Sequence, residues 1–136
     1  MPRRTELRRD LVVLACAISA GIHGALVPDH FHEGPGAGAG FVAATVLLAA
    51  VVLVITFRPA DARGPLAAVA VLLGLLVSYV LAVTTGVPVL HPEAEPIDGL
   101  ALATKAVEAA GLLAALELMR RSRPAAALLL PKGTLT

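Results

Sequence analysis

The chain has 136 residues, of which 57% are hydrophobic, with a formal net charge of +1 and a mean hydropathy of +0.83. Aromatic residues make up only 3%, so the apolar mass is mainly Ala, Val and Leu, which suits close helix packing in lipid better than the core of a soluble domain. The single cysteine excludes a disulfide within the chain, and the composition argues against an ordinary soluble domain.

Four apolar stretches follow one another along the chain, at residues 11–28, 40–57, 66–85 and 97–119. Each approaches or exceeds the roughly 20 residues that a helix needs to cross the hydrocarbon core of a bilayer. The segments between them are rich in Pro, Gly and charged residues, as turns are. We therefore predict an all-α protein, a four-helix membrane bundle that forms one domain over 1–136, with a tail at 120–136.

The first stretch has a second interpretation, as a cleaved signal peptide. Only residues 11–15 separate Asp10 from Cys16, and this is shorter than the apolar region of about 7–15 residues that a signal peptide with cleavage at this cysteine would need. Cleavage after a small residue near Ala20 stays open as an alternative. We expect the stretch to remain as a membrane span.

The basic residues are distributed unevenly between the two sides of the predicted membrane domain. All but one of the 11 Lys and Arg residues lie before the first span, in the second connection or after the fourth span. Cytoplasmic segments of membrane proteins carry such an excess of Lys and Arg. This predicts that both termini and the tail are cytoplasmic and that the first and third connections face outward.

The two outward connections and their flanks hold acids and every histidine. Residues 30 and 32 flank Phe31, so in an extended segment both imidazoles would point to one side. Imidazole with carboxylate is a ligand set that suits zinc or copper(II). The alternative is that these side chains only solvate the membrane surface. The candidate metal ligands are His23, His30, His32, His91, Asp29, Glu33 and Glu93.

His23 differs from the other histidines because it lies inside an apolar span. An ionisable residue within a span is costly to insert and is by default a functional candidate. One alternative is a neutral imidazole that bonds to a neighbouring helix. Another is an axial ligand of haem b, with a second copy of the chain supplying the other ligand.

The fourth span carries a stripe of polar residues. Lys105 and Glu108 are three residues apart, a spacing at which helical side chains meet, and each charge would cost at least about 2.5–3.5 kcal/mol near the midplane. We therefore expect them to pair in the bundle interior, with His23 nearby. Asp98 and Thr84 are the further members of this predicted cluster. It suggests a proton or cation path, or alternatively an ion pair that only fixes helix orientation.

Three segments, GIHGALVPDHF, TTGVP and EPIDGLALATKAVEAAG, carry a resemblance that extends over the whole chain. In them the sequence resembles a group of small, uncharacterised four-span membrane proteins of actinobacterial type. The resemblance implies a multi-pass protein of the bacterial cytoplasmic (inner) membrane. The resemblance implies no activity and assigns no site residues.

The leading prediction is a small integral membrane protein that binds copper or zinc at an outward face, as a metal-handling or accessory subunit. The alternatives are an ion or proton transporter or channel subunit that uses Lys105 and Glu108, and a membrane anchor for haem b. We expect contact with the lipid bilayer, and a homo-oligomer or a place in a larger membrane complex. No nucleophile–base set, phosphate loop or nucleic-acid-binding pattern is present, so we expect neither an enzyme of soluble type nor a nucleic-acid partner.

Overall fold

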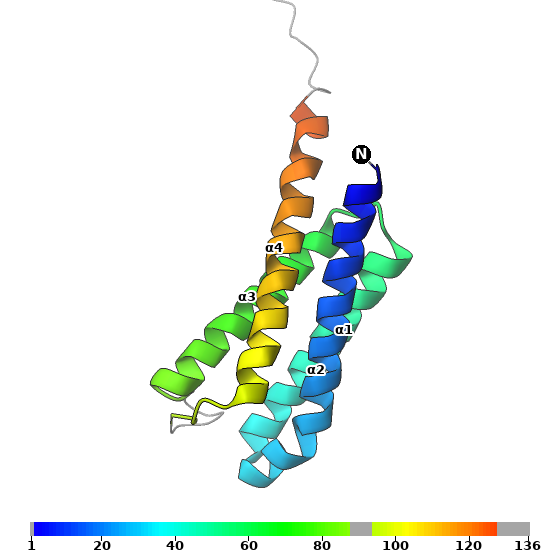
Figure 1. Ribbon diagram of the computed structural model, residues 1–136. Coiled ribbons are helices and arrows are strands. Elements are labelled where there is room, and N and C mark those ends of the chain that lie inside the picture. The colour runs from blue at the N-terminus through cyan, green and yellow to red at the C-terminus, as the bar shows by residue number, and fades with distance from the viewer. Residues whose placement is uncertain (1, 88–93, 128–136) are drawn as a thin grey trace, which may run out of the picture.

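The computed structural model describes residues 2–87 and 94–127, and these form a bundle of four helices (Figure 1). Helix α1 spans Pro2–Glu33, α2 Pro35–Phe57, α3 Arg63–Thr84 and α4 Gly99–Ala127. Each of the four is long and apolar enough to cross a membrane. The predicted all-α fold with four membrane spans is confirmed, and the protein is a multi-pass membrane protein with lipid-facing helices.

The first connection is much shorter than the sequence suggested. We expected a loop from Asp29, but α1 continues through Pro28 to Glu33, and α2 begins at Pro35. Proline is tolerated in membrane helices because neighbouring groups can satisfy the backbone that it frees, and at the first position of α2 its missing N–H is not needed. Gly34 alone lies between the helices, its N–H donating to the His30 carbonyl at 3.0 Å.

This helical path corrects the expected placement of two histidines. His30 and His32 lie in α1 and not in an extended segment. Residues two apart on a helix do not face each other, so the two imidazoles point to different sides of α1. The α1–α2 corner is closed by the Phe31 ring, which packs on Gly38 so tightly that no Cβ would fit there.

Small residues also let α1 approach α4. A Cβ built on Gly111 of α4 would lie 2.7 Å from the Ala15 Cβ of α1, well inside the normal contact distance. Close approach of this kind, through glycine and alanine, is typical of helix pairs in membranes. The crossing lies one turn from the polar residues of both helices, and it brings Ser19 of α1 next to Glu108 of α4.

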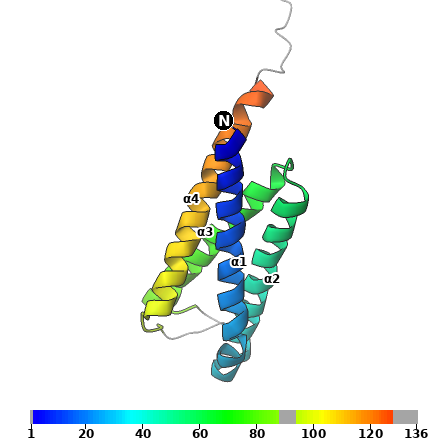
Figure 2. The same cartoon turned by 45° about the vertical axis from the view of Figure 1, so that its right-hand side comes forward.

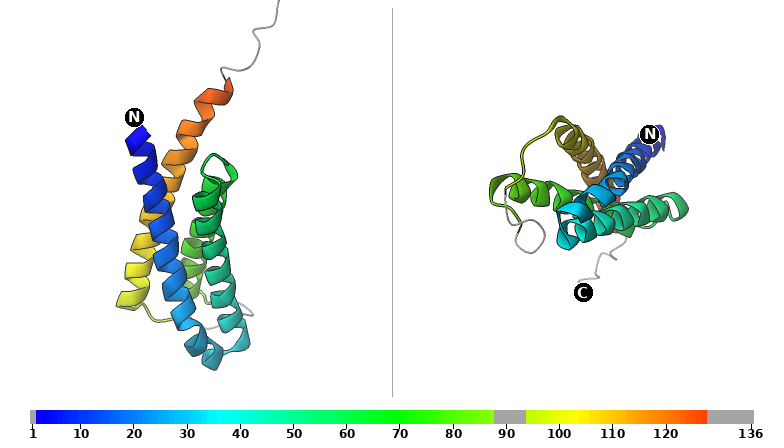
Figure 3. Two further views of the ribbon diagram at one scale, coloured as in Figure 1. Left: turned by 90° about the vertical axis from the view of Figure 1, so that its right-hand side faces the viewer. Right: turned by 90° about the horizontal axis from the view of Figure 1, so that it is seen from below.

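The apolar core fills only one end of the bundle. It is built from the first half of α1 and α3 and the second half of α2 and α4. Its members are Val12, Cys16, Leu48, Val51, Ile55, Ala68, Leu72, Ala114, Ala115 and Leu118. At the opposite end, the end of α3 lies away from the tip of the α1–α2 hairpin (Figures 1 and 3). Among residues 2–87 and 94–127, the bundle is therefore closed by its apolar core at one end and holds a pocket at the other.

The start of α1, the α2–α3 connection and the end of α4 lie together at the closed end (Figures 1 and 2). Arg9 donates to the Pro59 carbonyl at 3.3 Å, and Arg8 lies 3.9 Å from Glu117 of α4. Among the Lys and Arg residues that the structure describes, only Lys105 lies away from this end. We name the end that carries these Lys and Arg residues the basic end, and the opposite end of the bundle the open end.

The third connection lies at the open end. Gly86, with a φ of 71°, follows the last turn of α3, where the Thr85 N–H donates to the Leu81 carbonyl. The chain is described again from residue 94, and the Glu95 N–H donates to the Ala82 carbonyl at 2.9 Å. His91 and Glu93, two of the predicted metal ligands, lie outside the described residues.

Candidate functional site

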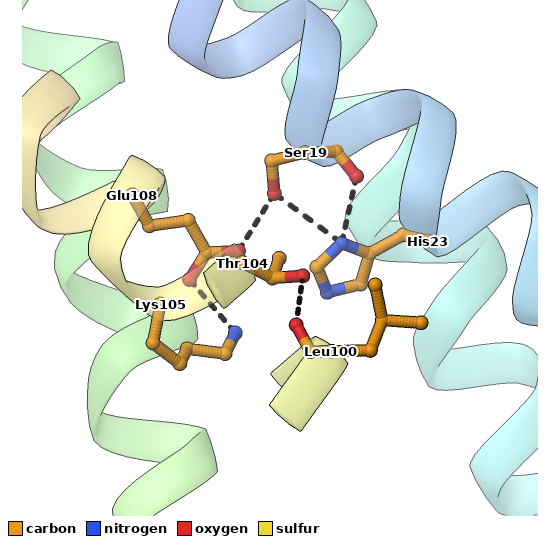
Figure 4. A network of polar contacts seen from close by, with 6 residues as sticks. All are labelled: Ser19, His23, Leu100, Thr104, Lys105 and Glu108. Atoms are coloured by element: carbon orange, nitrogen blue, oxygen red, sulfur yellow. Dashed lines mark hydrogen bonds and ion pairs between the residues drawn. The ribbon is translucent and has the colours of Figure 1, made fainter. Parts of the chain in front are cut away.

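The Glu108 carboxylate is the centre of a polar cluster between α1 and α4 (Figure 4). Its residue is fully buried, at 0% exposure. Lys105 Nζ donates to one carboxylate oxygen at 2.7 Å, and Ser19 Oγ donates to the other at 2.6 Å. Both oxygens of a wholly buried carboxylate therefore have a donor, and one of these donors carries a charge.

His23 joins this cluster through Ser19, one helical turn before it. Its Nδ1 lies 2.9 Å from the Ser19 carbonyl oxygen and 3.3 Å from Ser19 Oγ. A carbonyl oxygen only accepts, so Nδ1 carries the proton, and in the neutral ring Nε2 keeps its lone pair. Within the described residues Nε2 makes no hydrogen bond. We name Ser19, His23, Lys105 and Glu108 the polar cluster.

The polar cluster lies beside a pocket of about 450 Å³ in the open half of the bundle. All four helices contribute to its wall, and the segment before α4 forms part of its rim. His23 and Lys105 line it, whereas Glu108 is hidden behind them. The other polar residues of the wall are His30, Glu33, Ser78, Tyr79, Glu95, Asp98 and Thr104.

Phe41 of α2 forms an aromatic contact with two histidines at the pocket wall. The His30 ring stacks on it with centroids 3.5 Å apart, and the His23 ring lies 5.1 Å from it. His30 Nδ1 lies 2.9 Å from the Leu26 carbonyl, so His30 has the same tautomer as His23. Its Nε2 lies 3.9 Å from the Glu33 carboxylate.

Tyr79 of α3, another residue of the pocket wall, approaches Lys105. The Lys105 Nζ lies 5.5 Å from the centre of the Tyr79 ring, which is within cation–π range. The Tyr79 hydroxyl is buried, and no hydrogen-bond partner is present for it in the described part of the chain. The Lys105 ammonium thus contacts both the Glu108 carboxylate and an aromatic face.

The structure brings together only part of the predicted metal-ligand set. His23, His30 and Glu33 line the pocket, but Asp29 and His32 are exposed and lie outside its wall. Across residues 2–87 and 94–127, no group of three or more His, Cys, Asp or Glu side chains could hold a metal ion. The physical reason is that α1 stays helical to Glu33 and distributes these side chains around its axis.

Two members of the predicted intramembrane cluster lie apart from it. The Thr84 hydroxyl donates to the Val80 carbonyl of its own helix at 2.6 Å and is exposed, as is common for threonine in a helix. Asp98 caps α4 by accepting from the Ala101 N–H at 2.8 Å, which is the usual role of aspartate before a helix. Lys105 and Glu108 do form the contact expected from their spacing.

Ser19 is the member of the site that the sequence analysis missed. It supplies the only described hydrogen bonds between His23 and Glu108, two residues that are distant in the chain. A signal was present, since Ser19 is four residues before His23 and therefore on the same face of the first span. A serine hydroxyl in a helix often hydrogen-bonds to a backbone carbonyl of the same helix, so this spacing alone did not indicate a hydrogen-bond partner on another helix.

Comparisons with protein-family models, with curated proteins and with solved structures find no match to this chain. The chemistry of the site therefore rests on its own geometry. A buried carboxylate, a hydroxyl and an imidazole form a continuous chain of hydrogen bonds from Glu108 to the wall of a pocket. Such a chain can move a proton, and a carboxylate behind a pocket can bind a cation.

Proposed function

We propose that the protein is an ion- or proton-translocating membrane subunit in which Glu108 takes up protons or small cations from the pocket. The observation that carries this proposal is the fully buried carboxylate, held by Lys105 and Ser19 directly behind the pocket wall. Ionisable groups inside a membrane are costly and line ion or proton paths in many membrane proteins. An ion pair that only fixed the helices would need neither the hydroxyl bridge nor an adjoining pocket.

The hydrogen-bond directions define a route for a proton. A proton from the pocket binds Nε2 of His23, and the proton on Nδ1 then moves to Ser19 Oγ. Ser19 passes its own hydroxyl proton to Glu108, so Ser19 is again a neutral hydroxyl and the carboxylate becomes a carboxylic acid. His23 is again neutral but now carries its proton on Nε2. Before the next transfer the original tautomer must be restored, with Nδ1 taking up a proton and Nε2 releasing one to the pocket.

The test is proton uptake by proteoliposomes that contain the purified protein and an internal pH-sensitive dye. With a potassium diffusion potential imposed by valinomycin, the parent protein should acidify or alkalinise the lumen at least tenfold faster than empty liposomes do. Glu108→Gln keeps the shape of the side chain and removes the titrating group, so the rate should fall to that of empty liposomes.

The matched control is Glu117→Gln, which changes a carboxylate on the same helix at the basic end, where Glu117 lies near Arg8 and Arg120. It should keep the parent rate. Equal rates for the parent and empty liposomes, or for Glu108→Gln and the parent, would refute the proposal. Far-ultraviolet circular dichroism of each variant shows whether the helices are retained.

We further propose that the basic end faces the cytoplasm of a bacterial cell and the pocket faces outward, in the inner membrane. The support is the excess of Lys and Arg at one end together with the positive-inside tendency of membrane proteins. The resemblance to small actinobacterial membrane proteins agrees with this location.

The proposal includes an oligomer or a larger membrane complex. Below the polar cluster, Val12, Cys16 and Leu72 are fully buried in the core that closes the basic end. A proton that reaches Glu108 therefore has no polar continuation within the described part of one chain. A second copy of the chain would supply it in the purified protein, and light scattering of the detergent-solubilised protein would give the number of copies.

Binding of copper or zinc is a second proposal, favoured by the shared tautomer of His23 and His30. In both, Nδ1 faces a backbone carbonyl and leaves Nε2 as the available nitrogen, the arrangement typical of histidine ligands. Elemental mass spectrometry of the purified protein tests it. Near-stoichiometric metal that is lost in a His23→Ala, His30→Ala variant would support it, and metal-free protein after loading would refute it. Haem b, proposed through His23, would give a Soret band in the same sample.

A further inference from the structure

The pocket combines apolar walls with an acidic rim. The wall includes aliphatic and aromatic side chains of every helix, such as Leu26, Phe41, Leu75 and Leu100. Its volume of about 450 Å³ is within the range of small-molecule sites, which are about 300–1,000 Å³. A pocket of this size and lining can hold more than a bare proton or a hydrated metal ion.

The charges around the pocket favour one sign of ligand. Its lining holds three carboxylates, Glu33, Glu95 and Asp98, and one lysine. Lys105 is already neutralised by Glu108, and Glu33 lies 3.9 Å from His30. The lining and the Glu108 carboxylate behind it together hold four carboxylates and one lysine, so acidic side chains are in excess. An anion would be repelled, whereas a cation would be attracted into the mouth.

The aromatic faces at the wall strengthen this preference. Phe41 of α2 and Tyr79 of α3 both line the pocket, and a cation is attracted to the face of an aromatic ring. The Tyr79 ring already has the Lys105 ammonium at 5.5 Å. The hydroxyl of Tyr79 is buried and has no hydrogen-bond partner among residues 2–87 and 94–127.

We propose that the pocket binds a small amphipathic organic cation, with its apolar body against the walls and its charge toward the acidic rim. This inference rests on the proposed function, because it names the substrate class that reaches the Glu108 site. The bound cation would lie on the pocket side of Lys105.

The chain contains a built-in reporter for this site. Tyr79 is the single tyrosine and the chain has no tryptophan, so ultraviolet fluorescence of the protein comes almost entirely from the pocket wall. The probe is cyclohexyltrimethylammonium, which does not absorb at the excitation wavelength. Its neutral isostere, tert-butylcyclohexane, has carbon in place of the charged nitrogen, and cyclohexanecarboxylate supplies the opposite charge.

Titrations of the protein in lipid nanodiscs, corrected for partition into empty nanodiscs, compare the three compounds. The cation should change the Tyr79 fluorescence with a half-saturation at least tenfold lower than that of either other compound. Its binding should weaken when the salt concentration rises, because the rim is exposed to solvent. Equal binding of the cation and its neutral isostere, or tighter binding of the anion, would overturn the inference.

Two matched double variants test whether the rim carboxylates are responsible for the cation affinity. Glu95→Gln with Asp98→Asn removes two rim carboxylates and keeps a capping side chain at 98, so cation affinity should fall at least fivefold. Glu6→Gln with Asp10→Asn makes the same change of charge at exposed positions of the basic end and should leave affinity unchanged. Equal affinity in the rim variant and its control would overturn the inference.

The result of the binding experiment can be distinguished from the result of the proton-uptake experiment that tests the proposed function. Binding is measured without a proton gradient, and proton uptake is measured without the organic cation. If the cation binds but Glu108→Gln leaves proton uptake unchanged, the proposed function fails and the pocket ligand stands. If uptake depends on Glu108 but the cation does not bind selectively, the proposed function stands and this inference fails.

Discussion

At the scale of single residues, Ser19 decides whether His23 and Glu108 act together. Its hydroxyl donates to one Glu108 oxygen and accepts from the His23 ring. Ser19→Ala leaves a buried carboxylate oxygen without its donor, which should lower the free energy of unfolding by about 1–3 kcal/mol. It should also reduce proton uptake at least tenfold, because it breaks the only described link between the imidazole and the carboxylate. Ser19→Thr keeps a hydroxyl and should restore part of the uptake.

The control for Ser19 is Thr104→Val, a change of similar size at another buried hydroxyl. The Thr104 hydroxyl donates to the Leu100 carbonyl, which belongs to the backbone of the same helix, at 2.8 Å. Loss of this hydroxyl should therefore lower the free energy of unfolding less than loss of the Ser19 hydroxyl. Chemical unfolding in mixed micelles and the liposome assay measure both variants. Equal effects of the two changes would mean that Ser19 has no special role.

At the scale of helices, the position of the site depends on how closely α1 approaches α4. Gly111→Ala places a Cβ about 2.7 Å from the Ala15 Cβ, so one helix must move away. We expect a loss of about 1–3 kcal/mol in unfolding free energy, typical of an overpacked contact, together with a longer Ser19–Glu108 distance.

Gly74→Ala is the control for this crossing, because a Cβ at Gly74 of α3 would meet nothing within 4 Å. Alanine replaces glycine favourably inside a helix, so this variant should gain up to about 1 kcal/mol. Unfolding titrations of both variants give the comparison. A Gly111→Ala protein as stable as the Gly74→Ala protein would show that the α1–α4 crossing tolerates a wider spacing.

At the scale of the whole molecule, the proposed orientation predicts which end of the bundle is accessible from outside. Ala60 and Ala94 are both exposed, the first at the basic end and the second at the open end. In a Cys16→Ala background, Ala94→Cys should react with a membrane-impermeant maleimide added to intact cells, and Ala60→Cys should react only after the cells are opened. The reverse pattern would place the pocket on the cytoplasmic side and invert the proposed direction of uptake.

The four helices were predictable from sequence because lipid demands long apolar segments with internally satisfied backbones. The contact between Lys105 and Glu108 followed from helical spacing alone. The tight corner at Gly34 was not predictable, because its shape depends on the Phe31 ring packing on Gly38, a contact made only after the helices fold together. The candidate metal ligands His91 and Glu93 stay a prediction.

The link between Ser19 and Glu108 was also beyond sequence reasoning. It joins two helices that are far apart in the chain, and it depends on the close approach at Ala15 and Gly111. Apolar patterning shows that a helix is membrane-spanning but not which neighbour each face meets. The pocket has the same origin, because side chains of all four helices line it and come together only when the helices pack.

The one-residue connection at Gly34 has a consequence for biogenesis. Because α1 and α2 are joined by a single residue, the two helices have to enter the membrane together, and their tip must cross it in one step. The tip carries Asp29 and Glu33 but no Lys or Arg. In the proposed orientation, a membrane potential that is negative inside pulls these carboxylates outward, by about 2.3 kcal/mol per charge for each 100 mV. The energised membrane would then itself drive the hairpin into place.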